Sequence, residues 1–122
     1  MYTIYLKDED LITRDQFPVI ALINEAANSD IIEFTRTLVN GVGSGYDYSN
    51  CSFWNDLDDY DKANTPRFDG LWITNEANEE VIVPFKELLY YLEILYSRLS
   101  AKHFPRIDEL RQLLDSFKAS YC

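Results

Sequence analysis

The chain has 122 residues, of which 47% are apolar and only eight are glycine or proline, so its composition is that of one folded domain and not of a disordered or collagen-like protein. Its 21 acidic residues outnumber 11 basic ones and give a net charge of −10. Contacts to phosphate come from lysine and arginine, so this balance argues against partners such as nucleic acid or an anionic membrane surface. We therefore expect any macromolecular partner to be basic.

The sequence favours a cytoplasmic protein. Residues 1–10 lack the basic and apolar regions of a signal peptide. No apolar stretch approaches the roughly 18 residues of a membrane span. Cys51 and Cys122 do not form a CxxC pair, and Cys122 is the last residue, so we expect two free thiols in a reducing compartment.

A strand and two helices are predicted in the first 41 residues. Alternating aromatic and β-branched residues predict a strand over residues 2–6. A helix is expected to begin near Asp15. Asp30 and Glu33 have the spacing of a capping box, which opens a second helix that residues 40–41, Asn-Gly, bring to an end.

The middle of the chain contains a predicted hairpin. The glycine-rich residues 41–45 lack the preceding strand and the lysine of a phosphate-binding loop, so we interpret them as a flexible connector. Residues 68–74 and 79–83 have the composition of strands. The polar residues between them, 75–78, are typical of a turn.

Two amphipathic helices are predicted to complete the chain, with Pro84 and Pro105 at their starts. Apolar residues recur at helical spacing, namely Phe85, Leu88, Leu89, Leu92, Leu95, Tyr96 and Leu99, then Ile107, Leu110, Leu113, Leu114 and Phe117. The short link over 101–104 favours antiparallel packing. We therefore predict a single α+β domain over 1–122, in which a small antiparallel sheet, the hairpin plus the N-terminal strand, packs with about four helices.

The sequence contains no established catalytic motif. GxSxG, the P-loop, HExxH and CxxC are absent, and the single histidine, His103, lies far along the chain from Cys51. Residues 56–61 are acidic, but Asp61 and Arg67 stand where an EF-hand requires glycine and glutamate. Weak calcium binding and acid–base catalysis by paired carboxylates stay open as alternatives. We expect no enzyme activity, no cofactor and no metal site.

The segment from Tyr46 to Asp61 combines five carboxylates with five aromatic residues and contains no lysine or arginine. It belongs to a longer acidic stretch, residues 47–80, with nine acidic and two basic residues. One interpretation is a solvated loop whose aromatic side chains fold into the core. The other is a surface for a basic protein, with tyrosine and tryptophan as stiff anchors and carboxylates that steer the encounter.

A family resemblance covers roughly residues 66–100. Phe-Asp-Gly-Leu-Trp-Ile at 68–73, an acidic turn, and Glu-Glu-Val-Ile-Val-Pro-Phe-Lys-Glu-Leu-Leu-Tyr-Tyr-Leu at 79–92 resemble the small immunity proteins of bacterial contact-dependent growth inhibition, and among these the proteins that protect against ribonuclease toxins. The resemblance implies a cytoplasmic inhibitor that binds, one to one, the toxin domain at the C-terminus of a large secreted exoprotein. It transfers no catalytic motif and no individual contact residue.

The net negative charge of the chain agrees with this expectation, because ribonucleases are commonly basic and a carboxylate-rich inhibitor can occupy their RNA cleft. The residues predicted to bind the toxin are Asp47, Trp54, Asp56, Asp58, Asp59, Tyr60, Asp61, Asp69, Glu79 and Glu80. Two alternatives stay open: an acidic adaptor or chaperone-like module for another basic protein, and a small hydrolase.

Overall fold

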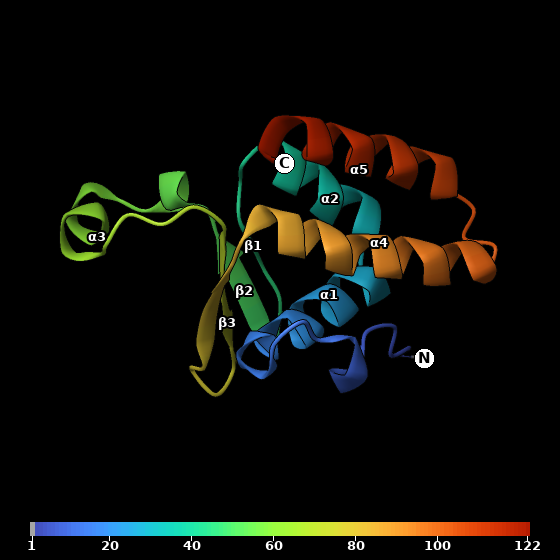
Figure 1. The fold of residues 1–122 in the computed structure, drawn as a ribbon, viewed down its shortest axis with the longest axis horizontal. Coiled ribbons are helices and arrows are strands. Elements are labelled where there is room, and N and C mark those ends of the chain that lie inside the picture. The colour runs from blue at the N-terminus through green and yellow to red at the C-terminus, as the bar shows by residue number, and fades with distance from the viewer. Residues whose placement is uncertain (1) are drawn as a thin grey trace.

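The computed structural model describes residues 2–122, in which one four-stranded antiparallel sheet packs against helices (Figure 1). The helices are α1 (Pro18–Asn28), α2 (Ile31–Val39), α3 (Asp59–Asn64), α4 (Phe85–Ala101) and α5 (Ile107–Tyr121). The strands are β1 (Ser44–Gly45), β2 (Ser49–Ser52), β3 (Leu71–Asn75) and β4 (Glu80–Val83), in the sheet order β1-β2-β3-β4. The predicted α+β class is confirmed.

The N-terminal helices begin where local chemistry favours it. Pro18 is the first residue of α1, where its missing N–H has no helical partner to lose. The helix therefore starts three residues after the predicted Asp15. Asp30 caps α2 as predicted, because its carboxylate accepts a hydrogen bond from the backbone N–H of Glu33 at 3.0 Å. Asn40 follows as the C-cap of α2.

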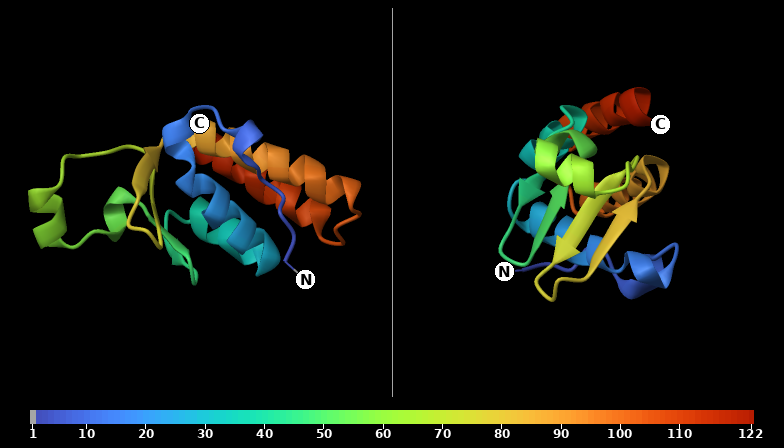
Figure 2. Two further views of the ribbon diagram at one scale, coloured as in Figure 1. Left: turned by 90° about the horizontal axis from the view of Figure 1, so that it is seen from below. Right: turned by 90° about the vertical axis from the view of Figure 1, so that its left-hand side faces the viewer.

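The two C-terminal helices form the largest helical layer. Their predicted apolar stripes are buried through Leu88, Leu92, Leu95 and Leu99 in α4, and through Leu110, Leu114 and Phe117 in α5. The helices lie side by side, and α5 also packs on α2 (Figures 1 and 2). A two-pronged ion pair between Arg111 and Glu93, with both N–O distances 2.7 Å, joins α5 to α4.

The predicted N-terminal strand is wrong. Residues 2–6 belong to no strand, and their backbone bonds to side chains of α1 instead. The Asn24 amide oxygen accepts from the N–H groups of Tyr5 and Leu6, both at 2.9 Å, and its amide nitrogen donates to the Leu6 carbonyl at 3.0 Å. Asn28, one turn further along α1, pairs with the segment in the same way. The alternation of residues 2–6 therefore belongs to an extended segment that lies on a helix, where Leu6 is buried, and pairs with no strand.

The other half of the sheet comes from a part of the chain for which no strand was predicted. The expected flexible connector 41–45 ends in β1, and residues 46–48 turn the chain into β2, with the Tyr46 N–H bonded to the Ser49 carbonyl at 2.7 Å. The β3–β4 hairpin confirms the prediction for 68–83. Strand β2 joins the two halves by pairing with β3 from Ser49↔Asn75 to Ser52↔Trp72.

The sheet has one covered and one open face. Cys51, Leu71, Ile73 and Val83 are buried on the inner face, against which α1 packs. Side chains alternate along a strand, so Trp72, Glu80 and Ile82 lie on the outer face. Trp72 is half-buried and the Ile82 side chain is 43% exposed. The outer face therefore presents apolar surface to solvent.

The N-terminal segment is also held by an ion pair whose strength should depend on pH. Arg98 of α4 donates to both carboxylate oxygens of Asp10, at 2.6 and 2.7 Å, and to the Tyr5 carbonyl. The hydrogen bond from Arg98 holds the pKa of Asp10 below its usual value. Asp10 therefore contributes stability above the pKa of an unfolded aspartate, about 3.9, and this contribution is lost as the pH falls through the lower folded pKa.

Replacing Asp10 with asparagine should lower the free energy of unfolding by about 1–3 kcal/mol near neutral pH, because charged hydrogen bonds are lost. The difference from the native chain should shrink as the pH falls below about 4. Urea midpoints at neutral pH and near pH 3 measure both quantities. The exposed neighbour Asp8, changed to asparagine, is the matched control and should differ little from the native chain. A gap for Asp10→Asn that stays constant with pH would contradict this account.

Candidate functional site

Residues 53–70, which we call the arm, leave the sheet after β2 and return to it at β3. The arm contains a short helical turn over Trp54–Asp56 and then α3, and it projects away from the helical layer (Figures 1 and 2). None of the residues of α3 is buried. Seven of the ten predicted toxin-binding residues lie on this projection, namely Trp54, Asp56, Asp58, Asp59, Tyr60, Asp61 and Asp69.

Two of these carboxylates shape the arm itself. Asp56 accepts hydrogen bonds from the backbone N–H groups of Phe53, at 2.6 Å, and Gly43, at 2.9 Å. It therefore closes the turn at the start of the arm and ties it to the segment before β1. Asp58 caps α3 by accepting from the backbone N–H of Asp61 at 2.7 Å. Both side chains have a structural role that the sequence analysis did not assign.

Glycines permit close backbone contacts where the arm joins the sheet. A Cβ atom on Gly43 would lie 2.2 Å from the Cys51 carbonyl oxygen and 2.9 Å from the Asp56 carboxylate. Gly70, at the other end of the arm, has φ +138°, and a Cβ there would lie 2.6 Å from the Val83 carbonyl oxygen. Larger residues at either position would displace the base of the arm.

The aromatic residues of the acidic segment divide between core and surface. Phe53 is buried, and half-buried Tyr46 packs on Phe34 with ring centroids 6.1 Å apart. Tyr48 and Tyr60 point outward, and Tyr60 on α3 is 74% exposed. Each of the two interpretations offered by the sequence therefore describes some of these residues.

Three aromatic rings hold the arm on the outer sheet face. Trp54 meets Phe68 edge to face at 5.5 Å, and Phe68 meets Trp72 of β3 in the same way at 5.8 Å. The Arg67 guanidinium lies 5.1 Å from the centre of the Trp54 ring and forms an ion pair with Asp69 at 3.2 Å. This arrangement brings Asp69, one of the predicted toxin-binding residues, into contact with a base of the same arm.

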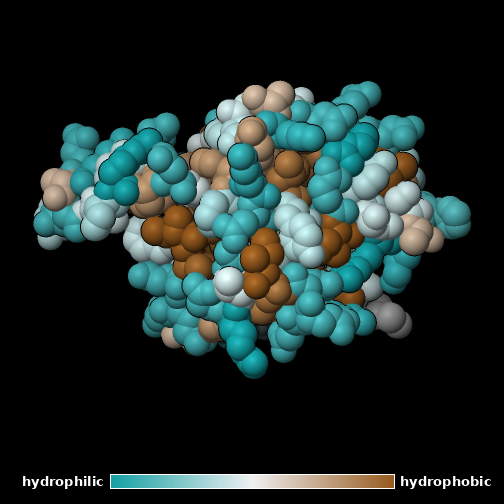
Figure 3. Space-filling model, viewed as in Figure 1, coloured by the Kyte–Doolittle hydropathy of each residue, from teal (hydrophilic) through white to brown (hydrophobic). Residues whose placement is uncertain are grey.

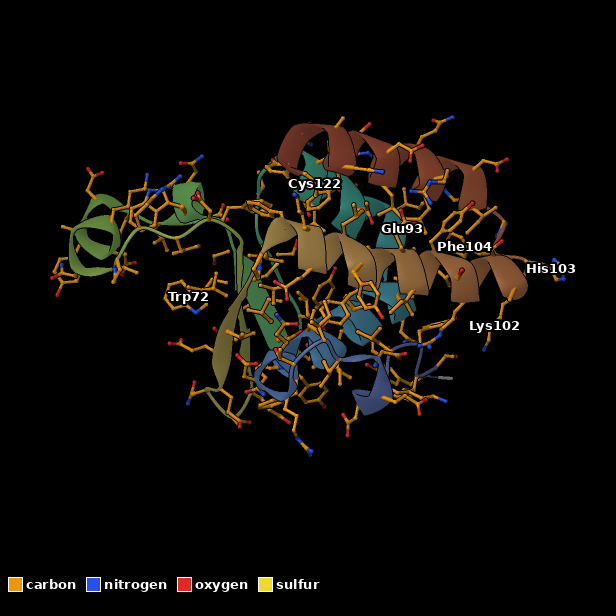
Figure 4. All side chains as sticks on the ribbon, viewed as in Figure 1. Trp72, Glu93, Lys102, His103, Phe104 and Cys122 are labelled. Carbon is orange, nitrogen blue, oxygen red and sulfur yellow. The ribbon has the colours of Figure 1, made fainter. Side chains whose placement is uncertain are left out.

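An open groove of about 490 Å³ separates the returning arm from the outer sheet face. We call it the arm groove; it is lined by residues 64–68, Trp72 and residues 80–82. Figure 3 shows apolar side chains in the angle between arm and body, and Figure 4 shows Trp72 there, beside β3. The Trp72 indole N–H donates to the Glu80 carboxylate at 3.2 Å.

The predicted residues do not form one cluster. Asp47 lies in the β1–β2 turn and Glu79 in the β3–β4 turn, and the pairing of Ser49 with Asn75 places these turns together at the end of the sheet opposite the base of the arm. Glu80 faces outward beside the arm groove. The acidic surface thus has two parts, the arm and the hairpin end.

The apolar members of this surface, Phe68, Trp72 and Ile82, were not among the predicted site residues. The alternation of residues in the hairpin contained the signal, because Trp72 and Ile82 are cross-strand partners on the face opposite buried Leu71 and Val83.

Three further features bear on function: a metal site, a membrane-spanning helix and a cysteine–histidine pair. Residues 2–122 contain no group of three or more histidine, cysteine, aspartate or glutamate side chains placed to hold a metal ion. Over the same residues, no helix is both long and apolar enough to cross a membrane. Cys51 is buried in β2, whereas His103 is exposed in the α4–α5 link at the far end of the molecule (Figures 1 and 4). The fold therefore does not unite these two side chains.

The two free cysteines should differ in reactivity. Burial raises the pKa of Cys51 to about 12, so its thiol stays protonated at mildly alkaline pH. Desolvation raises the pKa of Cys122 as well, but this residue is exposed at the C-terminus, where a reagent can reach its thiol. With Ellman's reagent near pH 8, we expect one thiol to react in the native chain and the second only after unfolding in urea. The variant Cys122→Ser should show almost no fast reaction. Rapid modification of both thiols in the native state would contradict the burial of Cys51.

No protein-family model matches the chain, and neither a curated protein nor a solved structure does.

Proposed function

We propose that this chain is an immunity protein, which binds a basic ribonuclease toxin domain one to one and prevents RNA from reaching the active site of the toxin. The observation that carries the proposal is the acidic arm, which projects from the sheet and bears exposed Asp59, Tyr60 and Asp61 on α3. A projecting element of this kind suits insertion into the concave cleft of an enzyme. The sequence resemblance of residues 66–100 to immunity proteins supports the choice of partner.

The charges of the acidic stretch support a basic partner. Among residues 47–80, nine are acidic and two are basic, and one of the two bases, Arg67, already pairs with Asp69. Among the described residues of this stretch, Arg67–Asp69 is the one ion pair, so most of the carboxylates are not paired with a base. Repulsion between crowded carboxylates destabilises the free protein, and a basic partner relieves it. The negative electrostatic field of these carboxylates also accelerates the approach of such a partner.

Inhibition in this proposal is steric and electrostatic. The arm and the outer sheet face cover the cationic cleft that RNA would otherwise occupy, and no bond is made or broken. The toxin would act on cellular RNA, so the inhibitor would work in the cytoplasm.

A titration of RNA cleavage tests the proposal. The toxin to use is the C-terminal domain of a large exoprotein encoded directly upstream of the gene for this chain. Cleavage of a fluorogenic RNA should fall linearly to zero at one equivalent of inhibitor, with nanomolar or tighter affinity, on the order of −12 kcal/mol. An unrelated basic ribonuclease is the control and should remain active.

Three outcomes of this titration are informative. Inhibition of the toxin alone supports the proposal. Full cleavage despite a stable complex would favour an adaptor or chaperone-like module, and equal inhibition of both ribonucleases would indicate nonspecific charge binding. Either of the last two outcomes would refute the proposed function.

A further inference from the structure

The arm groove has an apolar floor, which two strands and the arm build together. Trp72 of β3 and Ile82 of β4 are direct cross-strand partners on the outer sheet face, and the Ile82 side chain is 43% exposed. Phe68 supports the Trp72 ring from the arm side, with centroids 5.8 Å apart. Residues 64–67 of the returning arm form the opposite wall. The groove thus offers a flat indole and an aliphatic side chain to an incoming group.

One carboxylate lies at the polar edge of this floor. Glu80 is the only acidic residue among those that line the groove, and it accepts a hydrogen bond from the Trp72 indole N–H. Within residues 2–122, Glu80 takes part in no ion pair. The other charged lining residue, Arg67, is paired with Asp69. The groove therefore presents one uncompensated negative charge next to an indole ring.

The arm already uses this chemistry once for an internal side chain. The Arg67 guanidinium lies over the Trp54 ring, 5.1 Å from its centre, and bonds to the Asp69 carboxylate at 3.2 Å. A tryptophan face with an adjacent carboxylate is a good receptor for a planar guanidinium, which stacks on the ring and donates to the oxygens. Trp72 and Glu80 also place a carboxylate beside an indole ring, here at the ring edge through the indole N–H, and no lysine or arginine of residues 2–122 lies over the Trp72 ring.

We propose that the arm groove receives an arginine side chain of the basic partner, with its aliphatic stem on Trp72 and Ile82 and its guanidinium against Glu80. This inference rests on the proposed function for the identity of the partner, whereas the affinity for arginine is argued from the residues of the groove alone. The net charge of −10 and the acidic arm beside the groove argue for a cationic occupant over a neutral or acidic one. Arginine suits the indole better than lysine, because its planar group can stack and bond at the same time.

Short peptides test the receptor without the toxin. The probes are acetyl-Gly-Arg-Gly-amide, the same peptide with lysine, and the same peptide with citrulline, an uncharged isostere of arginine. The reporters are the indole N–H signals of the two tryptophans of the ¹⁵N-labelled chain. We expect the arginine peptide to shift the Trp72 signal in a saturable way, the lysine peptide to bind more weakly, and the citrulline peptide to bind at least about fivefold more weakly. Equal shifts from arginine and citrulline peptides, or none from either, would overturn the proposal.

Two variants separate Glu80 from the general negative field. Glu80→Gln keeps the size of the side chain and an oxygen for the Trp72 N–H, and should weaken the arginine peptide by about five- to tenfold. Glu76→Gln is the matched control, because it removes the same charge from an exposed residue of the β3–β4 turn that neither lines the groove nor belongs to the predicted toxin-binding residues, and it should change the affinity by less than about twofold. The spectra show directly whether each variant is folded. Equal weakening by the two variants would refute a specific arginine site.

The toxin domain then distinguishes this inference from the proposed function. If the native chain inhibits the toxin and Glu80→Gln inhibits it equally tightly, the groove does not hold the partner and the inference fails while the proposed function stands. If the groove binds the arginine peptide but the chain neither binds nor inhibits the toxin, the proposed function fails and the receptor remains.

Discussion

Replacing Leu114 with alanine is expected to lower the free energy of unfolding by about 2–5 kcal/mol, and Leu92→Ala by a similar amount. Leu114 is completely buried in α5 and Leu92 is 1% exposed in α4, so each truncation removes apolar contacts and leaves a cavity between helices. Small domains are stable by about 5–15 kcal/mol, so either change should remove a large share of the total.

Urea denaturation followed by circular dichroism measures both variants. Ile4→Ala serves as the control, because the Ile4 side chain is 53% exposed, and it should change the stability by no more than about 0.5 kcal/mol. If the midpoints of Leu92→Ala and Leu114→Ala move no further than that of Ile4→Ala, the assignment of these helices to the core is wrong.

The second large effect is expected in the rate at which the proposed toxin partner associates. The double variant Asp59→Lys/Asp61→Lys should slow association by about 10–100-fold at low salt, because exposed charges steer the encounter. Asp56 and Asp58 are kept, since their carboxylates hold backbone N–H groups of the arm and its helix cap. The dissociation rate should change much less.

The matched control is Asp8→Lys/Glu9→Lys, which makes the same change in charge within an exposed helical turn near the N-terminus, away from the arm. Stopped-flow mixing with the toxin domain measures both variants. Raising the salt from about 50 to 500 mM, which contracts the Debye length from about 14 to 4 Å, should reduce the difference between the arm variant and the native chain. Equal slowing by the arm and control variants would show that only net charge matters.

The elements predicted well are those whose signals are local. The stripes of α4 and α5 repeat over several turns, and the Asp30 cap depends on a residue three positions away. The prediction of an N-terminal strand was wrong because the side chains of an extended segment alternate in the same way whether the segment pairs with a strand or lies on a helix. Asn24, a polar residue on the apolar side of α1, was the available sign that backbone groups would bond there.

Strands β1 and β2 were missed because they are short and rich in serine, glycine and asparagine, which have weak strand propensity. They form because β2 pairs with β3, some twenty residues further along the chain. Such pairing depends on distant partners, and a single sequence does not display them.

For the candidate site, the sequence predicted which types of residue take part better than it predicted how they are arranged in space. Charge identified the arm acids, yet it did not separate Asp59 from Asp56. Both are exposed, but the Asp56 carboxylate accepts hydrogen bonds from two backbone N–H groups. The cap of α3 could have been recognised, since Asp58 stands three residues before Asp61. The arm groove could not, because it exists only where the returning arm lies beside the outer face of the hairpin.

The most direct test of the central claim, that the arm and the outer sheet face bind the toxin, is the amide spectrum of the ¹⁵N-labelled chain with one equivalent of catalytically inactive toxin domain. We expect the largest changes over residues 53–70 and over the outward-facing positions of β3 and β4, including the indole signal of Trp72. Signals from the exposed side of α5 should stay in place. Changes confined to the helical layer, with the arm and Trp72 unaffected, would contradict the claim.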